Sequence, residues 1–198
     1  RLVSIGGGYV SFDFAHIAAR AGAQVPILHR GERPLDAFDA DLVKELLTAT
    51  RSIGIDVRLH VEVSAIEKER NQLQVYTSDG AGFPADLVVH GAGRIPEIDG
   101  LNLEQGDIEY TAHGVVVNDY LQSASNPAVY AAGDSAATKA PKLTPVAVAD
   151  GHVVSSNLLK GNQRMPDYTA TPSVVFTVPS LAKAGLNEDE AREQGLKF

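Results

Sequence analysis

Hydrophobic and polar positions in the first thirty residues follow strand-like and helix-like patterns in turn. An apolar run at 2–5 precedes three glycines, and apolar residues at helical spacing then fill positions 10–21. Gly22 is placed to end that helix, and a second apolar run occupies 25–28. A strand, a glycine turn, a helix and a strand in this order predict a βαβ unit with parallel strands.

The pattern continues with a second helix and further strands. Apolar residues on one side predict a helix over 41–53, followed by a strand at 55–59. Runs at 61–68 and 73–77, separated by turn residues, predict an antiparallel meander, and 85–89 is expected to return to the parallel sheet. The predicted fold class is therefore α/β, a Rossmann-like domain with an antiparallel meander.

Beyond residue 94 the pattern is less regular. A short strand is expected at 128–132, a helix over 145–159 opened by a proline, and another strand at 173–176. Asn187 and Glu190 have the spacing of a helix capping box. Pro26 falls within the second predicted strand, where its missing N–H is expected to cost a ladder bond.

Composition narrows the possible functions. The 198 residues carry a net charge of −8, which disfavours nucleic acid as a partner because phosphate binding requires clustered Lys and Arg. No apolar run reaches the roughly 18 residues of a membrane span, and we expect a cytoplasmic protein. Without cysteine these residues hold no thiol nucleophile. Arg1 leads directly into an apolar run and Met165 is the sole methionine, so we expect a piece of a longer protein.

The glycine turn has the spacing of a dinucleotide-binding fingerprint. Gly6 would make the tight turn, Gly8 would let a pyrophosphate approach the backbone, and the small Ser11 would let the helix pack close to the strand. The N-terminus of the following helix offers free N–H groups to phosphates. A glycine turn without a ligand is the alternative, but its place inside a βαβ unit favours nucleotide binding.

The end of the second strand bears on which dinucleotide binds. NAD-binding domains usually place an acidic residue there, whereas His29 stands here with Arg30 and Arg33 close behind. Guanidinium groups pair with a 2′-phosphate, so we expect NADP(H) rather than NAD(H). Glu32 could neutralise either arginine, and a solvated loop is the alternative interpretation of both.

With these residues in view, the chain resembles the class I pyridine nucleotide-disulfide oxidoreductases, which include glutathione reductase, dihydrolipoamide dehydrogenase and mercuric reductase. The resemblance covers nearly the whole chain. Five segments follow the order of the family's motifs: Gly6–Tyr9 with Asp13 and Phe14, Gly91–Pro96, Val129–Asp134, Leu143–Pro145 with Ala147, and Pro172–Thr177.

The resemblance implies roles for individual residues. Tyr9 would lie beside a flavin ring and Asp13 near it, although the family usually has glutamate at the latter position. Asp134 would accept a hydrogen bond from the ribityl chain of FAD, and Thr144 and the helix beginning near Pro145 would point backbone N–H groups at the flavin. The remaining residues expected to bind cofactor are Gly93, Arg94, Gly133, Leu143 and Ala147.

The resemblance also implies a domain organisation and an activity. Residues 1–110 would form the NAD(P)-binding domain, 111–165 the C-terminal part of an FAD domain, and 166–198 the start of a dimerisation domain. The intact protein, a homodimer, would pass hydride from NADPH to FAD and on to a disulfide-type acceptor. The redox cysteines, the upstream FAD motif and the distal histidine-glutamate pair of the family do not occur in these residues, so this chain alone is not expected to reduce a disulfide.

Two other functions fit part of the sequence. A stand-alone NAD(P)-binding regulatory module would explain the first ninety residues but not the later motifs. A hydrolase with Ser135 as nucleophile would need a base, for which Asp150 and His152 are the nearby candidates. Ser180 and Lys183 have a serine–lysine spacing but lack companion motifs and are expected on a helix surface.

No metal site is predicted. The six histidines show no ligand spacing; His16 is expected on a helix face and His90 at a strand end. Asp36, Asp39 and Asp41 form an acidic loop whose expected roles are helix capping and solvation.

Overall fold

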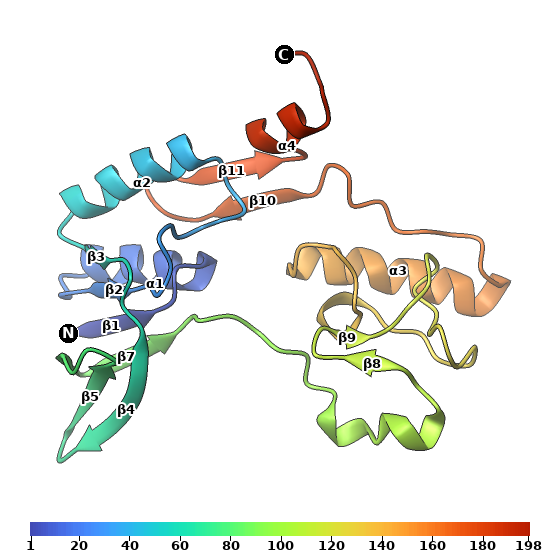
Figure 1. Ribbon diagram of the computed structural model, residues 1–198, viewed down its shortest axis with the longest axis horizontal. Helices are drawn as coiled ribbons and strands as arrows, with labels where there is room; N and C mark the ends of the chain where they lie inside the picture. The colour runs from blue at the N-terminus through green and yellow to red at the C-terminus, as the bar shows by residue number, and fades with distance from the viewer. The chain divides into compact units, whose positions relative to one another are not determined.

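A computed structural model describes all 198 residues and divides them into two compact units (Figure 1). The first unit comprises Arg1–Gly93 together with Pro172–Phe198, and the second comprises Arg94–Thr171. The expected boundary at residue 110 does not coincide with a boundary between units. Residues 94–110 cluster with the second unit, and 172–198 pack on the first. The assignment of the units to nucleotide, flavin and dimerisation domains stays a prediction.

The first unit is built on a four-stranded parallel sheet in the order β3-β2-β1-β7. Every residue of β1 is buried, as expected for a parallel strand covered on both faces. Its strands and the two helices that connect them are β1 (Leu2–Ile5), α1 (Tyr9–Arg20), β2 (Pro26–Leu28), α2 (Ala40–Ser52), β3 (Asp56–Arg58) and β7 (Leu87–His90). These bounds confirm the predicted βαβ unit and second helix to within two residues.

Side chains of the parallel sheet point alternately to its two faces and form a separate hydrophobic core on each. Leu2 and Ile27 point to the face covered by α1 and α2, whereas Val3 and Leu28 point to the opposite face. That opposite face is covered by a three-stranded antiparallel meander formed by β4 (Val63–Glu69), β5 (Gln72–Thr77) and β6 (Gly82–Ala85). The sheet is thus covered on both faces, and the carboxyl ends of its strands stay available for a site.

The single strand expected at 85–89 is two strands in the structure. β6 ends at Ala85 and pairs antiparallel with β5, while β7 begins at Leu87 and pairs parallel with β1. Asp86 lies between them, so the chain changes sheets there. Pro26 is the first residue of β2, and the pairing of β2 with β1 starts at Ile27. A proline at the start of a strand need not interrupt the ladder.

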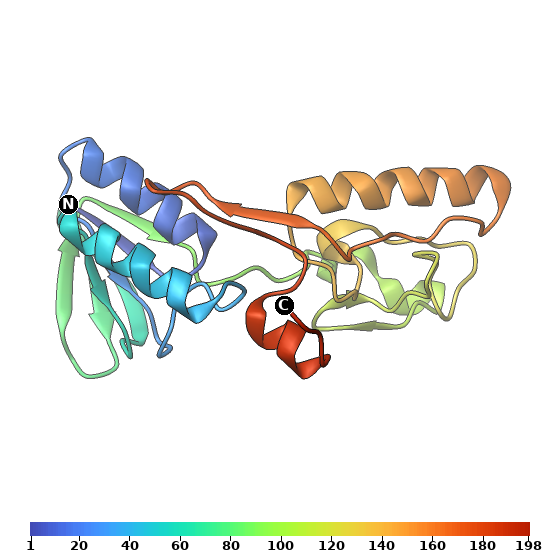
Figure 2. The ribbon, with the colours of Figure 1, turned by 90° about the horizontal axis from the view of Figure 1, so that it is seen from above.

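The C-terminal segment adds a small layer to the first unit. β10 (Pro172–Val175) and β11 (Leu181–Ala184) form an antiparallel pair that contacts α1 and α2, and α4 (Glu188–Glu193) follows (Figure 2). Val175 and Leu181 are buried in the core shared with both helices. The capping box at Asn187 is confirmed: its side chain accepts from the Glu190 N–H, and the glutamate side chain accepts in return. β11 was not predicted.

The second unit is organised around α3 (Thr144–Lys160), which confirms the predicted helix. Its other regular elements are a short hairpin, β8 (Tyr110–Thr111) and β9 (Gly114–Val115), and three 3-10 turns at Asp99–Leu101, Leu103–Gly106 and Gly133–Ser135. The strand expected at 128–132 is wrong. Residues 121–123 and 129–131 pair through one bridge only, between Gln122 and Tyr130, because each segment follows directly on a turn, at Asn118–Leu121 and at Asn126–Val129.

Candidate functional site

The glycine turn between β1 and α1 leaves a helix N-terminus open. Gly6 has φ of +103°, and a Cβ there would lie 2.4 Å from the Gly91 carbonyl oxygen. That close approach, together with the left-handed backbone, requires glycine. Gly8 precedes α1 without a side-chain cap, so N–H groups of the first turn are free to bind an anion.

Ser11 acts behind this turn rather than in front of it. The Ser11 side chain is fully buried, and its Oγ donates to the Ile5 carbonyl at 3.1 Å. A Cβ on Gly91 would lie 2.5 Å from that Oγ, which shows how closely helix and strand approach here. Ser11 therefore has the packing role that the fingerprint predicts for its small third residue.

A cleft of about 790 Å³ opens in front of the glycine turn. It lies at the carboxyl ends of β1, β2 and β7, the edge where open parallel sheets bind ligands. Its wall is completed by the first residues of β4 and the segment before it. The predicted site residues that line it are Gly6, Gly8, Tyr9, His29, Arg30 and Gly93.

His29 is wedged between two glycines at the end of β2. A Cβ on Gly7 would lie 2.6 Å from the His29 Nδ1, and one on Gly31 would lie 2.8 Å from its Nε2. The Nε2 lies 3.0 Å from the Arg33 carbonyl oxygen. Because a carbonyl can only accept, Nε2 carries the proton in this contact and Nδ1 faces the glycine turn.

The two arginines after β2 lie in different environments. Arg30 is exposed, lines the cleft and makes no ion pair. Arg33 does not line the cleft; its guanidinium lies 3.9 Å from the Asp36 carboxylate. Glu32 pairs with neither arginine, so the expected competition from this residue does not occur in the structure.

Tyr9 and Asp13 lie on successive turns of α1. Tyr9 is half-buried at the cleft, with its ring centroid 5.6 Å from that of Phe38. The Asp13 carboxylate is half-buried and accepts the Phe176 N–H at 2.8 Å, which ties α1 to the segment after β10. Burial raises the pKa of Asp13, and the Phe176 N–H opposes that rise. Asp13 does not line the cleft.

His16 lies on α1, as expected, and is only 2% exposed. Its Nε2 lies 2.9 Å from the Thr50 Oγ, and its Nδ1 faces both Arg20 and the Val178 N–H. Burial and then the Arg20 charge lower the pKa of His16 to about 4. The histidine thus joins α1, α2 and the C-terminal segment as a neutral side chain.

A second group of predicted residues comes together in the second unit. Gly133 has φ of +59°, and a Cβ there would lie 2.6 Å from the Ala147 Cβ. Asp134 pairs with Arg94 at 3.0 Å, and Arg94 also donates to the Lys142 carbonyl. Leu143 precedes α3, which begins at Thr144 without a side-chain cap. The turn at Gly133 therefore lies against the open N-terminal end of α3, a helix of 17 residues.

A buried carboxylate behind this turn had no predicted structural role. Asp150 is fully buried in α3; its Oδ2 accepts the Gly133 N–H at 3.0 Å and its Oδ1 accepts the Tyr168 hydroxyl at 2.8 Å. Burial and the Asp150 contact raise the pKa of Tyr168. The available signal was an acidic residue on the otherwise apolar face of a predicted helix.

The geometry does not assemble a hydrolase. The Ser135 hydroxyl donates to the Ala132 carbonyl, and His152 is exposed and makes no hydrogen bond. Ser180 directly precedes β11 and Lys183 lies within it, so neither residue is on the expected helix. No three His, Asp or Glu side chains are grouped as a metal site would require, and no helix combines the length and apolar character of a membrane span.

Comparison with known proteins relates this arrangement to a family. The model of the pyridine nucleotide-disulphide oxidoreductase family matches residues 1–151. A glutathione reductase of Burkholderia cepacia is 36% identical over 194 residues, which cover 98% of this chain and 43% of that protein. The chain thus spans less than half the length of that relative.

Solved structures show the same fold. The HOCl-induced flavoprotein disulfide reductase RclA of Escherichia coli, in complex with Cu(II), has a TM-score of 0.84 and 29% identity. The match covers 97% of this chain and 44% of that one. An engineered water-forming NADPH oxidase bound to NADPH has a TM-score of 0.83 and 26% identity, over 99% of this chain and 45% of that one.

Proposed function

Because the chain belongs to the pyridine nucleotide-disulphide oxidoreductase family, we propose that its first unit binds NADP(H) in the cleft at the carboxyl end of the parallel sheet. The observation that carries the proposal is the glycine turn at Gly6, which exposes the N–H groups of α1 to a pyrophosphate. The cleft volume of about 790 Å³ suits an extended nucleotide.

The preference for the 2′-phosphate rests on Arg30. The Arg30 guanidinium is exposed at the cleft and free of ion pairs, so its donors are available for a bidentate contact with phosphate. The strand-end position holds His29 rather than a carboxylate that would accept the ribose hydroxyls. NADPH is also the nucleotide bound to the related engineered oxidase.

The second unit supplies part of a flavin site in this proposal. Asp134 would accept a hydrogen bond from the ribityl chain, and the N-terminus of α3 would stabilise negative charge on the ring. Tyr9 would lie beside the bound flavin, and Asp13 would lie near it. Flavin bound there would supply the redox chemistry that passes hydride equivalents from NADPH to a disulfide-type acceptor. We propose that the protein acts as a homodimer.

Calorimetric titration of the chain with NADPH and NADH at matched ionic strength tests the proposal. We expect NADPH to bind at least tenfold more tightly, and Arg30→Glu to weaken NADPH binding far more than NADH binding because it replaces attraction with repulsion. Arg70→Glu, in the turn between β4 and β5, makes the same charge change away from the cleft and should alter neither affinity.

Two results would contradict the proposal. If Arg30→Glu weakened the binding of NADPH and NADH equally, Arg30 would not be the residue that binds the 2′-phosphate. Flavin bound stoichiometrically to the purified chain would contradict the expectation that these residues hold only part of the flavin site and bind FAD weakly.

A further inference from the structure

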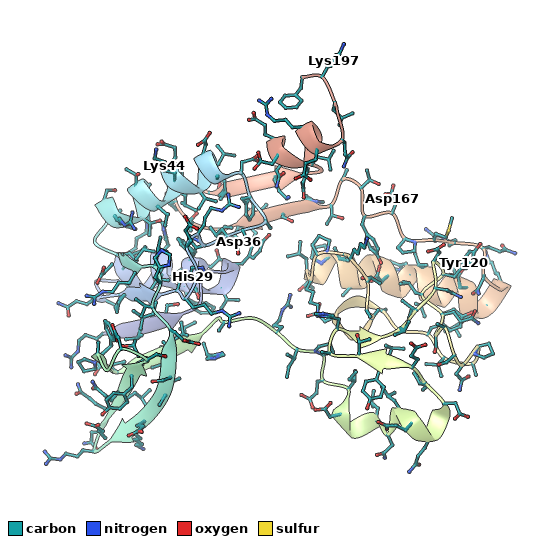
Figure 3. The ribbon with its side chains drawn as sticks, viewed as in Figure 1. His29, Asp36, Lys44, Tyr120, Asp167 and Lys197 are labelled. Atoms are coloured by element: carbon teal, nitrogen blue, oxygen red, sulfur yellow. The ribbon has the colours of Figure 1, made fainter.

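The cleft carries acidic as well as basic groups. Arg30 lines it, but so do Asp36 and Glu62, both exposed. Asp36 and His29, both labelled in Figure 3, line the same cleft. Arg33 lies outside, where it lines a separate hollow with Glu32 and residues of α2. The cleft therefore does not present the uniformly positive surface that a phosphate subsite with two arginines would have.

Arg33 is bound to the segment that carries Asp36. Its guanidinium lies 3.9 Å from the Asp36 carboxylate and donates to the backbone carbonyl of the same residue at 3.4 Å. Asp36 is the more exposed partner, with 77% of its side chain accessible against 37% for Arg33. An ion pair this long and this exposed neutralises the charge only in part, so the carboxylate keeps negative charge toward the cleft, and keeps less of it when Arg33 is present.

We infer that Asp36 is a specificity-determining residue that opposes the 2′-phosphate, and that Arg33 acts on the nucleotide only through Asp36. The inference rests on the proposed nucleotide site and deepens it. The cleft then holds two side chains with opposite effects. Arg30 favours NADP(H), whereas Asp36 favours NAD(H), whose free ribose hydroxyls can donate to a carboxylate. The preference for NADPH that we expect in calorimetry is the difference between the two contributions.

The physical reason is charge repulsion across a solvent-accessible cleft. A 2′-phosphate carries a charge of roughly −1.5 to −2 at pH 7, so a carboxylate within about one Debye length (~8 Å) of it raises the free energy of the complex. Two unit charges a few ångströms apart in a high dielectric interact by an amount equivalent to roughly a three- to tenfold change in affinity, on the order expected for Asp36. NADH lacks this phosphate, and the pyrophosphate that both nucleotides carry does not distinguish between them.

Asp36→Asn tests the inference by calorimetry on the full chain at about 150 mM salt, where exposed charges are still only partly screened. We expect it to strengthen NADPH binding roughly three- to tenfold and to leave NADH binding unchanged or weaker, with a smaller effect at higher salt. Asp41→Asn is the matched control. It removes the same charge from an exposed residue in the first turn of α2, outside the cleft, and should change neither affinity.

Arg33→Gln, made in the wild-type chain and in the Asp36→Asn chain, distinguishes an effect of Arg33 through Asp36 from a direct contact of Arg33 with the 2′-phosphate. If Arg33 acts through Asp36, its loss weakens NADPH binding roughly two- to threefold in the wild-type chain and has no effect in the Asp36→Asn chain. Equal weakening in both backgrounds would show that Arg33 contacts the phosphate and would overturn the inference.

Failure of the inference and failure of the proposed site give different results. Nucleotide binding with an NADPH-to-NADH ratio that Asp36→Asn does not change overturns the role of Asp36 alone. A wild-type chain that binds neither nucleotide overturns the proposed site and the inference with it. Thermal melts of each variant, expected to match the wild type closely because none of these side chains belongs to the core, show that the fold is retained.

Discussion

Protonation of His16 should destabilise the first unit at mildly acidic pH. Nδ1 of this buried ring faces two donors, the Arg20 guanidinium and the Val178 N–H, at 3.2 and 3.3 Å. Because both can only donate, Nδ1 must be the acceptor and Nε2–H donates to Thr50. A second proton on the ring would enter between two donors in a buried site, so the folded chain resists it.

The size of the effect follows from the two pKa values. The pKa of His16 is about 4 in the folded chain and 6.5 when the chain is unfolded. Between these values the unfolded state binds a proton that the folded state does not, so stability is lost as pH falls through this window. From pH 7 to pH 5 the loss is about 2 kcal/mol, and below pH 4 it levels off near ~3 kcal/mol.

Urea unfolding of the full chain, followed by circular dichroism at pH 7 and pH 5, measures this loss. Neighbouring Asp13 acts in the opposite direction, since burial raises its folded pKa. Comparison of the wild type with His16→Gln cancels that contribution and should show about 2 kcal/mol less pH dependence in the variant. His152→Gln, at an exposed position of α3, is the matched control.

The outcome that refutes the reasoning is an equal pH dependence in the wild type and His16→Gln. If His16→Gln does not fold, Thr50→Val provides a second route. It removes the acceptor of the Nε2 proton while it leaves the ring and its two donors in place. Stability should fall at pH 7, with the acid-induced loss retained.

Two further predictions concern glycines with positive φ and the buried carboxylate of Asp150. Gly6→Ala should abolish nucleotide binding in calorimetry, because its Cβ would lie 2.4 Å from a backbone oxygen. Gly22→Ala is the control: its φ of +88° is also positive, but a Cβ there would meet nothing within 4 Å. It should retain nucleotide binding and lower the stability seen in a thermal melt by only the ~1–3 kcal/mol of backbone strain. Asp150→Ala should destabilise the second unit by roughly 2–4 kcal/mol in urea, because two donors lose their partner, and Tyr168→Phe should cost about half as much. A loss for Asp150→Ala no larger than for Tyr168→Phe would show that the Gly133 N–H finds another acceptor.

Elements defined by local pattern were predicted well. β1, α1 and β2 follow from apolar spacing and glycine placement within thirty residues, and the capping box at Asn187 from two residues three apart. The strand expected at 128–132 failed because a strand needs a partner, and the turns before residues 121 and 129 limit its pairing with 121–123 to a single bridge. The split at Asp86 was missed for the same reason, since the choice of sheet depends on neighbours far along the chain.

The sequence by itself determined the order of the elements, the glycine turn and the residue types from which a nucleotide site could be built. These depend on backbone preference and side-chain size, which act between residues a few positions apart. Only the tertiary structure decided which side chains face which environment. Arg30 and Arg33 are three positions apart, yet one lines the cleft and the other pairs outside it. His16 and Asp150 are buried by elements distant in sequence, and long-range packing, not local pattern, sets burial and its effect on charge.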